Sequence, residues 1–258
     1  MAEGGSLRIL VTNDDGIHAP GLKGLEEIAR EISDLVWVVA PETEQSGASH
    51  SLSIAMPMRL REVSQGRYAV QGTPTDCVVM GLRHILKDQK VDLVLSGVNR
   101  GANIAGDVTY SGTIAAAMEG TLLGVPSIAL SQAVRAKNKN AKWSTARTHA
   151  PELIRRLIKL GWPRDVLINI NFPDAPHDAI QGVNVTRQGH QDISALYIDE
   201  HVDPRGVPYF WIGERGPYGD ASEDSDLIAL RNGYISVTPL HLDLTHDETY
   251  RAMQAALE

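Results

Sequence analysis

Polar side chains that could bind a metal ion or a phosphate directly follow three apolar runs of this chain, at residues 7–12, 35–41 and 91–95. The candidate ligands after these runs are Asn13, Asp14 and Asp15, the hydroxyl groups of the loop at 41–50, and Asn99 and Asn103. Carboxylate, hydroxyl and carboxamide oxygens suit Mg²⁺ or Mn²⁺ far better than zinc or copper. Two adjacent carboxylates also repel each other unless a cation or a proton intervenes. The pattern favours a divalent cation at Asp14 and Asp15, with a plain Asp-Gly turn as the alternative.

A second candidate site is the sequence Ser111-Gly112-Thr113, which precedes a run of small residues that predicts a helix to about residue 123. Serine is a preferred N-cap residue, so the simplest interpretation is a capped helix. The free backbone N–H groups and the two hydroxyls at such a helix start can also bind a phosphate. The two interpretations are compatible, and we expect Ser111, Gly112 and Thr113 to contact an anion.

The elements that would position these residues alternate between strands and helices. Continuous apolar runs, typical of strands buried on both faces, lie at residues 7–12, 35–41, 91–97, 126–131 and 166–173. Helical spacing of apolar residues follows Pro20 and Thr75, and residues 143–160 have the pattern of a helix. This alternation predicts an α/β fold, a three-layer Rossmann-like arrangement with a mostly parallel sheet. Ligands bind beyond the carboxyl ends of such strands, where the candidate residues lie.

The composition of the sequence changes after residue 182. Residues 183–240 contain polar strand-like pieces, Gly and Pro turns and an acidic stretch, and residues 247–257 predict a short helix. We therefore expect an α/β catalytic core at 1–182 and a polar, β-rich antiparallel extension or arm at 183–258. His18 and His50 lie in the loops of the expected site and are lesser candidates, because the nine histidines show no metal-binding spacing.

The charge balance disfavours one class of binding partner, long nucleic acid. The chain has 24 Lys and Arg against 32 Asp and Glu, a net charge of −8, which disfavours binding to long nucleic acid. The one cysteine of the chain cannot form an intramolecular disulfide.

The first residues lack a secretion signal, and no uninterrupted apolar run is long enough to span a membrane. We expect a soluble, cytoplasmic protein without a membrane partner.

Several catalytic motifs are absent from the sequence. It contains no G-x-x-x-x-G-K-[ST], so a P-loop mechanism is excluded. It also lacks G-x-S-x-G and, after the first apolar run, G-x-G-x-x-G, which disfavours a nucleophile elbow and dinucleotide binding. A phosphate-handling protein of this kind must gain positive charge locally, from a metal ion, a helix N-terminus or a few donors.

Six segments in order along the chain resemble the SurE family, whose members are described as survival-protein nucleotidases. The segments are ILVTNDDG at 9–16, PETEQSG at 41–47, GTPTDCV at 72–78, SGVNRGAN at 96–103, YSGT at 110–113 and SVTPL at 236–240. The resemblance implies a divalent-metal-dependent phosphomonoesterase that acts on nucleoside 5′- and 3′-monophosphates. It also implies a homodimer or homotetramer in which the C-terminal region is an exchanged arm.

Carried over by position, the resemblance implies metal ligands at Asp14, Asp15, Ser46 and Asn99. It implies phosphate binding by Asn13, Asn103, Ser111, Gly112 and Thr113. A metal ion would lower the pKa of a bound water, and Asp14 or Asp15 could accept the water proton as the general base. Two alternatives remain open: a broader phosphatase that also trims short polyphosphate, and a nucleotide-binding module without turnover, which the paired carboxylates disfavour.

Overall fold

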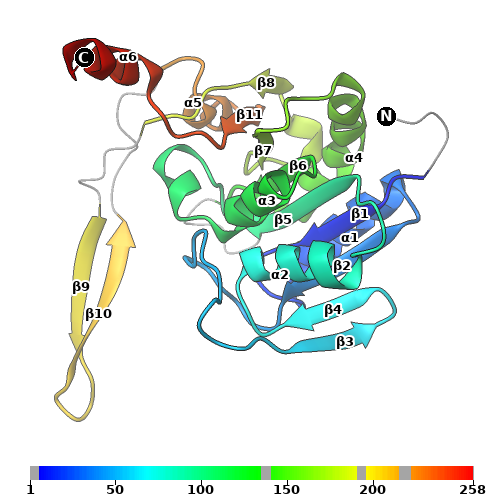
Figure 1. Ribbon diagram of the computed structural model, residues 1–258. Helices are drawn as coiled ribbons and strands as arrows, with labels where there is room; N and C mark the ends of the chain where they lie inside the picture. The colour runs from blue at the N-terminus through cyan, green and yellow to red at the C-terminus, as the bar shows by residue number, and fades with distance from the viewer. Residues whose placement is uncertain (1–5, 135–140, 191–195, 215–221, 258) are drawn as a thin grey trace.

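The computed structural model describes residues 6–134, 141–190, 196–214 and 222–257 (Figure 1). The strands are β1 (Ile9–Thr12), β2 (Val36–Pro41), β3 (Leu60–Ser64), β4 (Arg67–Val70), β5 (Leu93–Arg100), β6 (Ser127–Gln132), β7 (Val166–Phe172), β8 (Val183–Val185), β9 (Leu196–Val202), β10 (Pro208–Glu214) and β11 (Ile235–His241). The α-helices are α1 (Pro20–Ile32), α2 (Pro74–Met80), α3 (Gly112–Leu122), α4 (Trp143–Leu160), α5 (Asp226–Arg231) and α6 (Asp247–Leu257). In the described parts of the chain, no helix combines the length and the apolar character needed to cross a bilayer.

The central sheet has the order β3-β4-β2-β1-β5-β6-β7-β11-β8, and the six strands from β4 to β7 in this order are parallel. This confirms the α/β fold with a mostly parallel sheet. The chain winds from β1 through β2 to β4 on one side, and β5, β6 and β7 then follow on the other side of β1. The direction of winding therefore reverses between β1 and β5. A doubly wound sheet usually binds its ligand in the crevice beyond the carboxyl ends of the two strands at which the winding reverses, here β1 and β5.

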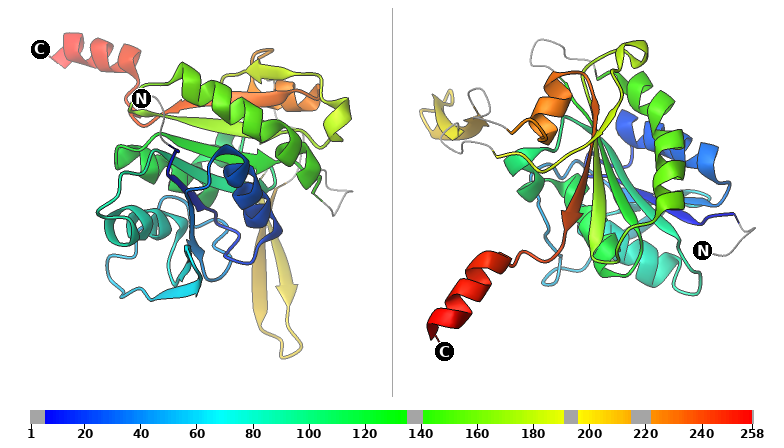
Figure 2. Two further views of the ribbon diagram at one scale, coloured as in Figure 1. Left: turned by 90° about the vertical axis from the view of Figure 1, so that its right-hand side faces the viewer. Right: turned by 90° about the horizontal axis from the view of Figure 1, so that it is seen from above.

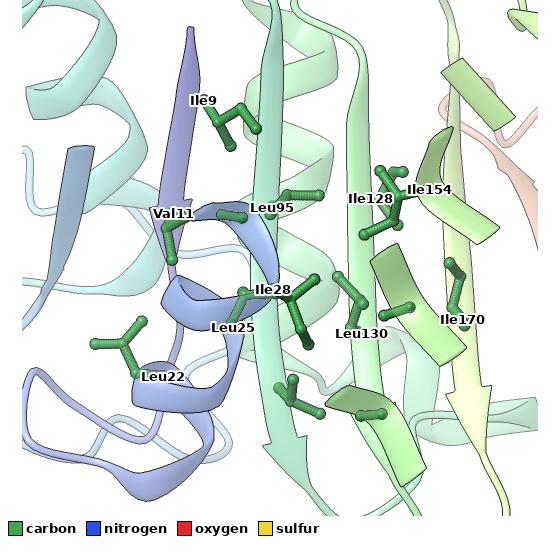
Figure 3. Close-up of a cluster of buried hydrophobic side chains, with 14 of the residues drawn as sticks. Ile9, Val11, Leu22, Leu25, Ile28, Leu95, Ile128, Leu130, Ile154 and Ile170 are labelled. Carbon is green, nitrogen blue, oxygen red and sulfur yellow. The ribbon is translucent and has the colours of Figure 1, made fainter. Parts of the chain in front are cut away.

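Helices cover both faces of this sheet (Figure 2). Alternate residues of a strand point to opposite faces, so that Ile9 and Val11 pack with α1 and α4, whereas Leu10 packs with α2 and α3. Figure 3 shows the first of these clusters, in which Leu25 and Ile28 of α1 lie over side chains of β1, β5 and β6. Because β1 and β5 are fixed from both sides, the loops at their carboxyl ends start from a rigid base.

Residues after 182 contribute to two different parts of the molecule. β11 pairs antiparallel with β7, and β8 pairs parallel with β11, so both strands extend the central sheet. β9 and β10 instead form a separate antiparallel hairpin that projects from the core, and α6 buries none of its side chains (Figure 1). The antiparallel extension expected from the sequence corresponds to this hairpin.

Candidate active site

A cavity of about 870 Å³ opens beyond the carboxyl ends of β1 and β5, at the switch point of the sheet. Six of the nine candidate residues line it, namely Asp14, Asp15, Ser46, Asn99, Asn103 and Ser111. They come from segments that are far apart in the sequence, since the loops after β1 and β2, the end of β5 and the start of α3 all meet here. The parallel sheet brings these segments together.

Asp14 is buried at the floor of the cavity. Its Oδ1 accepts a hydrogen bond of 2.5 Å from the hydroxyl of Thr113. The pKa of Asp14 is raised from 3.8 to about 6. Burial is the largest cause; the hydrogen bond from Thr113 opposes it, and the negative charge of Asp15 adds to it. The ionised form of Asp14 is thus disfavoured by its surroundings unless a positive charge is near.

Asp15 is half-buried beside Asp14 and faces the same cavity. Burial raises its pKa, and the nearby Glu44 carboxylate adds to this effect, whereas the backbone N–H of Arg100, 3.4 Å from Oδ2, opposes it. Asp14, Asp15 and Glu44 therefore line one cavity, and Asp107 lines it as well. Such a concentration of negative charge favours the binding of a cation.

Ser46 and Asn99 add neutral oxygen atoms to the two aspartates. The loop of Ser46 is tied to the first strand by a hydrogen bond of 2.8 Å from the backbone N–H of Gln45 to the carbonyl of Asp14. The hydroxyl of Ser46 donates to Glu44 at 2.8 Å. The side-chain nitrogen of Asn99 donates to the carbonyl of Gly101 at 3.1 Å, so the side-chain oxygen of Asn99 is the atom left to bind a cation.

This donor set fits a hard divalent cation. It combines carboxylates with a hydroxyl and a carboxamide, the oxygen ligands that Mg²⁺ and Mn²⁺ accept. Among the described residues no group of three His, Cys, Asp or Glu side chains gathers in a metal-binding arrangement. A cation at this position would therefore depend on Ser46 and Asn99 as well as on Asp14 and Asp15. The elevated pKa values of both aspartates agree with a site built to hold positive charge.

The start of α3 lies against Asp14. Ser111 is the N-cap residue, and its hydroxyl accepts a hydrogen bond of 3.0 Å from the backbone N–H of Ile114. A Cβ atom on Gly112 would lie only 2.8 Å from Cβ of Asp14, so glycine allows the helix to approach the carboxylate. Of the three residues expected to contact an anion, Ser111 lines the cavity, whereas Thr113 is buried and bonded to Asp14.

The two remaining candidates are asparagines with different surroundings. Asn13 is buried and does not line the cavity; its side-chain nitrogen donates to the carbonyl of Gly16 at 3.1 Å, and its Oδ1 has no partner in the described structure. Asn103 lines the cavity and is fixed by a buried polar network. Its side chain donates to Ser131 at 2.8 Å, its backbone N–H donates to Asn171 at 2.8 Å, and its carbonyl accepts from Asn169 at 2.8 Å. This network holds the loop after β5 at the rim of the site.

The cavity also contains residues that sequence reasoning did not select. They are Ala19, Pro20, Gly21, Glu44, Gly47, Arg100, Ala102, Asp107, Tyr110, Ala141 and Trp143. Arg100 and Tyr110 lie within the segments 96–103 and 110–113 that resemble the SurE family, and this position is the signal that could have found them. His18 and His50 do not line the cavity; His18 is exposed, and His50 contacts Glu119 of α3 at 3.0 Å.

Comparisons with known proteins agree with this geometry. The family model described as "Survival protein SurE" matches residues 9–195. The chain therefore belongs to the SurE family. The matched range includes every residue that lines the cavity, so the candidate site lies within the SurE part of the chain.

Similar SurE proteins cover almost the whole chain. A protein of Parvibaculum lavamentivorans named 5′-nucleotidase SurE is 58% identical over 260 residues, which span 100% of this chain and 94% of that protein. A 5′-nucleotidase SurE of Rhodopseudomonas palustris is 60% identical over 96% of this chain and 98% of its own. The crystal structure of the SurE protein from Aquifex aeolicus aligns with a TM-score of 0.84 at 39% identity, covering 97% of this chain and 100% of that chain.

Proposed function

We propose that this protein is a divalent-metal-dependent phosphomonoesterase that hydrolyses nucleoside 5′-monophosphates, and also 3′-monophosphates, to nucleoside and phosphate. The observation that carries the proposal is the pair Asp14 and Asp15, held beside the N-terminus of α3 at the switch point of the sheet. The names of its SurE relatives support the substrate class. A site with adjacent carboxylates and anion-binding donors is suited to phosphate chemistry assisted by a cation.

The residues that would hold Mg²⁺ or Mn²⁺ are Asp14, Asp15, Ser46 and Asn99. When bound, the ion supplies positive charge for the phosphate oxygens and lowers the pKa of water. Ser111 and the first N–H groups of α3 would bind the phosphate and stabilise the charge that develops on it. Asn103, held in place by Ser131 and Asn171, would bind the same group from the loop after β5.

Hydrolysis then requires a water to attack phosphorus while the ester P–O bond breaks and the nucleoside oxygen takes up a proton from the solvent. Asp14 or Asp15 would accept the proton of the attacking water. A carboxylate accepts this proton best through an oxygen atom that does not bind the ion. No covalent phosphoenzyme is needed, because water can reach the carboxylates from the open cavity.

We further propose that the protein forms a homodimer or homotetramer through its projecting hairpin. Alternate residues of a strand point to opposite faces of a hairpin. One face of β9–β10 presents Ile198, Val202, Phe210 and Ile212, all exposed, together with the charged residue Glu200. An apolar face of this kind is unfavourable in water unless a partner covers it. A second copy of the chain is the partner that the SurE resemblance suggests.

The experiment that tests the enzymatic proposal measures phosphate release from a panel of substrates with each divalent metal. We expect turnover of nucleoside 5′- and 3′-monophosphates that stops on chelation and returns with Mg²⁺ or Mn²⁺. Equal or faster turnover of tripolyphosphate would instead identify a broader phosphatase with polyphosphatase activity. Nucleotide binding by calorimetry without any phosphate release would identify a binding module and contradict the proposal.

A further inference from the structure

The cavity has two chemically different flanks. On the α3 side of the sheet, Tyr110 and Ser111 lie beside the carboxylates, where the phosphate is proposed to bind. The opposite flank is formed by the first turns of α1 and α4, and its lining residues are Ala19, Pro20, Gly21, Ala141 and Trp143. These side chains are apolar throughout. The cavity therefore passes from a charged end to an apolar end that carries one large aromatic ring.

Trp143 lies at the apolar end in a well-defined position. It is the first residue of α4, half-buried, and it packs against the core cluster shared by α1 and α4. A Cβ atom on Gly21 would collide with the carbonyl oxygen of Val98 and would lie 3.1 Å from Cη2 of Trp143. The indole thus contacts the first turn of α1, close to the residue that precedes Asn99 in β5.

The N-cap residue of α4, Lys142, and the first-turn residue Thr145 tie the chain around Trp143 to the segment that follows β7. The ammonium group of Lys142 forms an ion pair with Asp174 at 2.8 Å, and the hydroxyl of Thr145 donates to the carbonyl of Ala175 at 2.6 Å. These contacts fix the backbone on each side of Trp143. An aromatic ring that is already immobilised loses little conformational entropy when a ligand stacks on it.

We propose that Trp143 binds the base of the nucleotide by stacking, and so determines the preference for nucleoside monophosphates over smaller phosphate esters. This inference rests on the proposed function, because it requires a substrate with a base. An indole face is apolar and polarisable, and it stacks on the π-face of any base without reading its hydrogen-bonding edge. The platform therefore accepts all bases, and it favours purines over pyrimidines because their stacking face is larger.

The test compares AMP, UMP and ribose 5-phosphate as substrates for the wild type and for Trp143→Leu and Trp143→Phe. Leucine retains apolar packing but has no aromatic face, whereas phenylalanine retains one. We expect Trp143→Leu to lower kcat/KM for AMP about tenfold more than for ribose 5-phosphate, mainly through KM. Trp143→Phe should keep most of the preference for AMP, and the wild type should prefer AMP to UMP.

Trp162→Leu is the matched control, because Trp162 packs against the same core cluster but does not line the cavity. It should leave the ratio of AMP to ribose 5-phosphate turnover unchanged. The inference is overturned if Trp143→Leu lowers kcat/KM equally for both substrates, or if Trp162→Leu has the same selective effect.

Calorimetry with Mg²⁺ separates this inference from the proposed activity, with each ester replaced by its non-hydrolysable phosphonate because the active enzyme would consume AMP and ribose 5-phosphate during the titration. The wild type should bind AMP more tightly than ribose 5-phosphate, and this difference should disappear in Trp143→Leu. Absence of phosphate release would contradict the enzymatic function without affecting this comparison. Equal affinity of the wild type for AMP and ribose 5-phosphate would contradict the role of Trp143.

Discussion

The carboxyl group of Asp14 is buried between Thr113 and Asp15, and its pKa is raised from 3.8 to about 6 mainly by burial. Between these two values the folded protein retains a proton that the unfolded chain has released. The contribution of Asp14 to the free energy of unfolding therefore falls as the pH rises through about 6. Ionised Asp14, the form that would bind a cation, therefore lowers the free energy of unfolding of the metal-free protein.

Replacement of Asp14 should reveal this cost. In metal-free solution at pH 8, Asp14→Asn should be more stable than the wild type by on the order of 2–3 kcal/mol, since a pKa shift of one unit corresponds to about 1.4 kcal/mol. The gain should shrink as the pH falls below about 6. Urea unfolding across this pH range measures it.

Asp243→Asn is the control, because a hydrogen bond from Thr245 lowers the pKa of this exposed carboxyl group. Asp243→Asn should not become more stable relative to the wild type as the pH rises. A wild type as stable as Asp14→Asn at pH 8 would contradict the assignment of a raised pKa to Asp14.

Thr113 should control the pH at which Asp14 ionises. Its hydroxyl donates to Asp14 and thereby favours the carboxylate. Thr113→Val removes this donor and should raise the pKa of Asp14. The acid limb of the pH profile of kcat/KM should then move to higher pH, by on the order of one unit. Thr121→Val is a matched control in the same helix, since the buried Thr121 hydroxyl donates to the carbonyl of Ala117. Equal shifts in both variants, or none in Thr113→Val, would show that the bond to Asp14 does not set the ionisation.

Much of the site could be predicted at this scale from residue type and position. Asp14, Asp15, Ser46 and Asn99 follow strand ends, and in a parallel sheet these ends meet. The contact of Thr113 with Asp14 could not be predicted, because the direction of a side chain in the first turn of α3 depends on how that helix packs on β1. Trp143 also gave no local signal, since only the folded sheet brings α4 to the cavity.

At the scale of elements, the position of α3 relative to β1 determines the geometry of the site. Gly112 allows the start of α3 to lie directly against Asp14, because a Cβ atom on Gly112 would overlap that residue. Gly112→Ala should therefore displace the helix start and lower kcat/KM by about a hundredfold, in line with the loss expected when catalytic groups are misplaced by about an ångström. Steady-state kinetics with AMP measures this loss.

Gly24→Ala in α1 provides the comparison, because a Cβ atom there would meet its nearest neighbour, in Arg147, at 4.0 Å. It should raise the free energy of unfolding by about 0.5–1 kcal/mol and leave turnover unchanged. If Gly112→Ala were as active as Gly24→Ala, close contact between α3 and Asp14 would not be required for catalysis.

The sequence predicts the buried elements better than the edge elements. The apolar pattern of residues 143–160 predicts α4 with the ends that the structure shows. Apolar patterning does not reveal β3, and the strand-like pieces expected at 183–240 do not single out β8. Both are short strands at the two edges of the sheet, with exposed or partly exposed residues. Nor does apolar patterning show that β11 returns to the central sheet, because pairing between β7 and β11 joins distant segments.

At the scale of the whole molecule, the hairpin β9–β10 carries the exposed apolar side chains through which assembly is proposed. Phe210→Ser combined with Ile212→Ser should reduce the molecular mass measured by light scattering toward that of a monomer. Leu160→Ser removes an apolar side chain at the end of α4 that is more exposed than Phe210 or Ile212, and it should leave the mass unchanged. A wild type that is already monomeric, or a double variant of unchanged mass, would contradict assembly through the hairpin.

The net charge of −8 also has its explanation at this scale. Asp14, Asp15 and Glu44 concentrate negative charge in the cavity of a protein that is proposed to bind a phosphate anion. A divalent cation and the N-terminus of α3 would supply the missing positive charge locally. The acidic composition disfavours long polyanions and is compatible with a small phosphate ester.

The most direct test of the account is phosphate release from AMP, measured as Mg²⁺ or Mn²⁺ is added to chelated wild type and to chelated Asp14→Asn. The account predicts that the wild type regains activity in a saturable manner, whereas Asp14→Asn remains folded but inactive at every metal concentration. Full activity of the chelated wild type, or metal-restored activity in Asp14→Asn equal to that of the wild type, would contradict a metal-dependent phosphomonoesterase centred on Asp14.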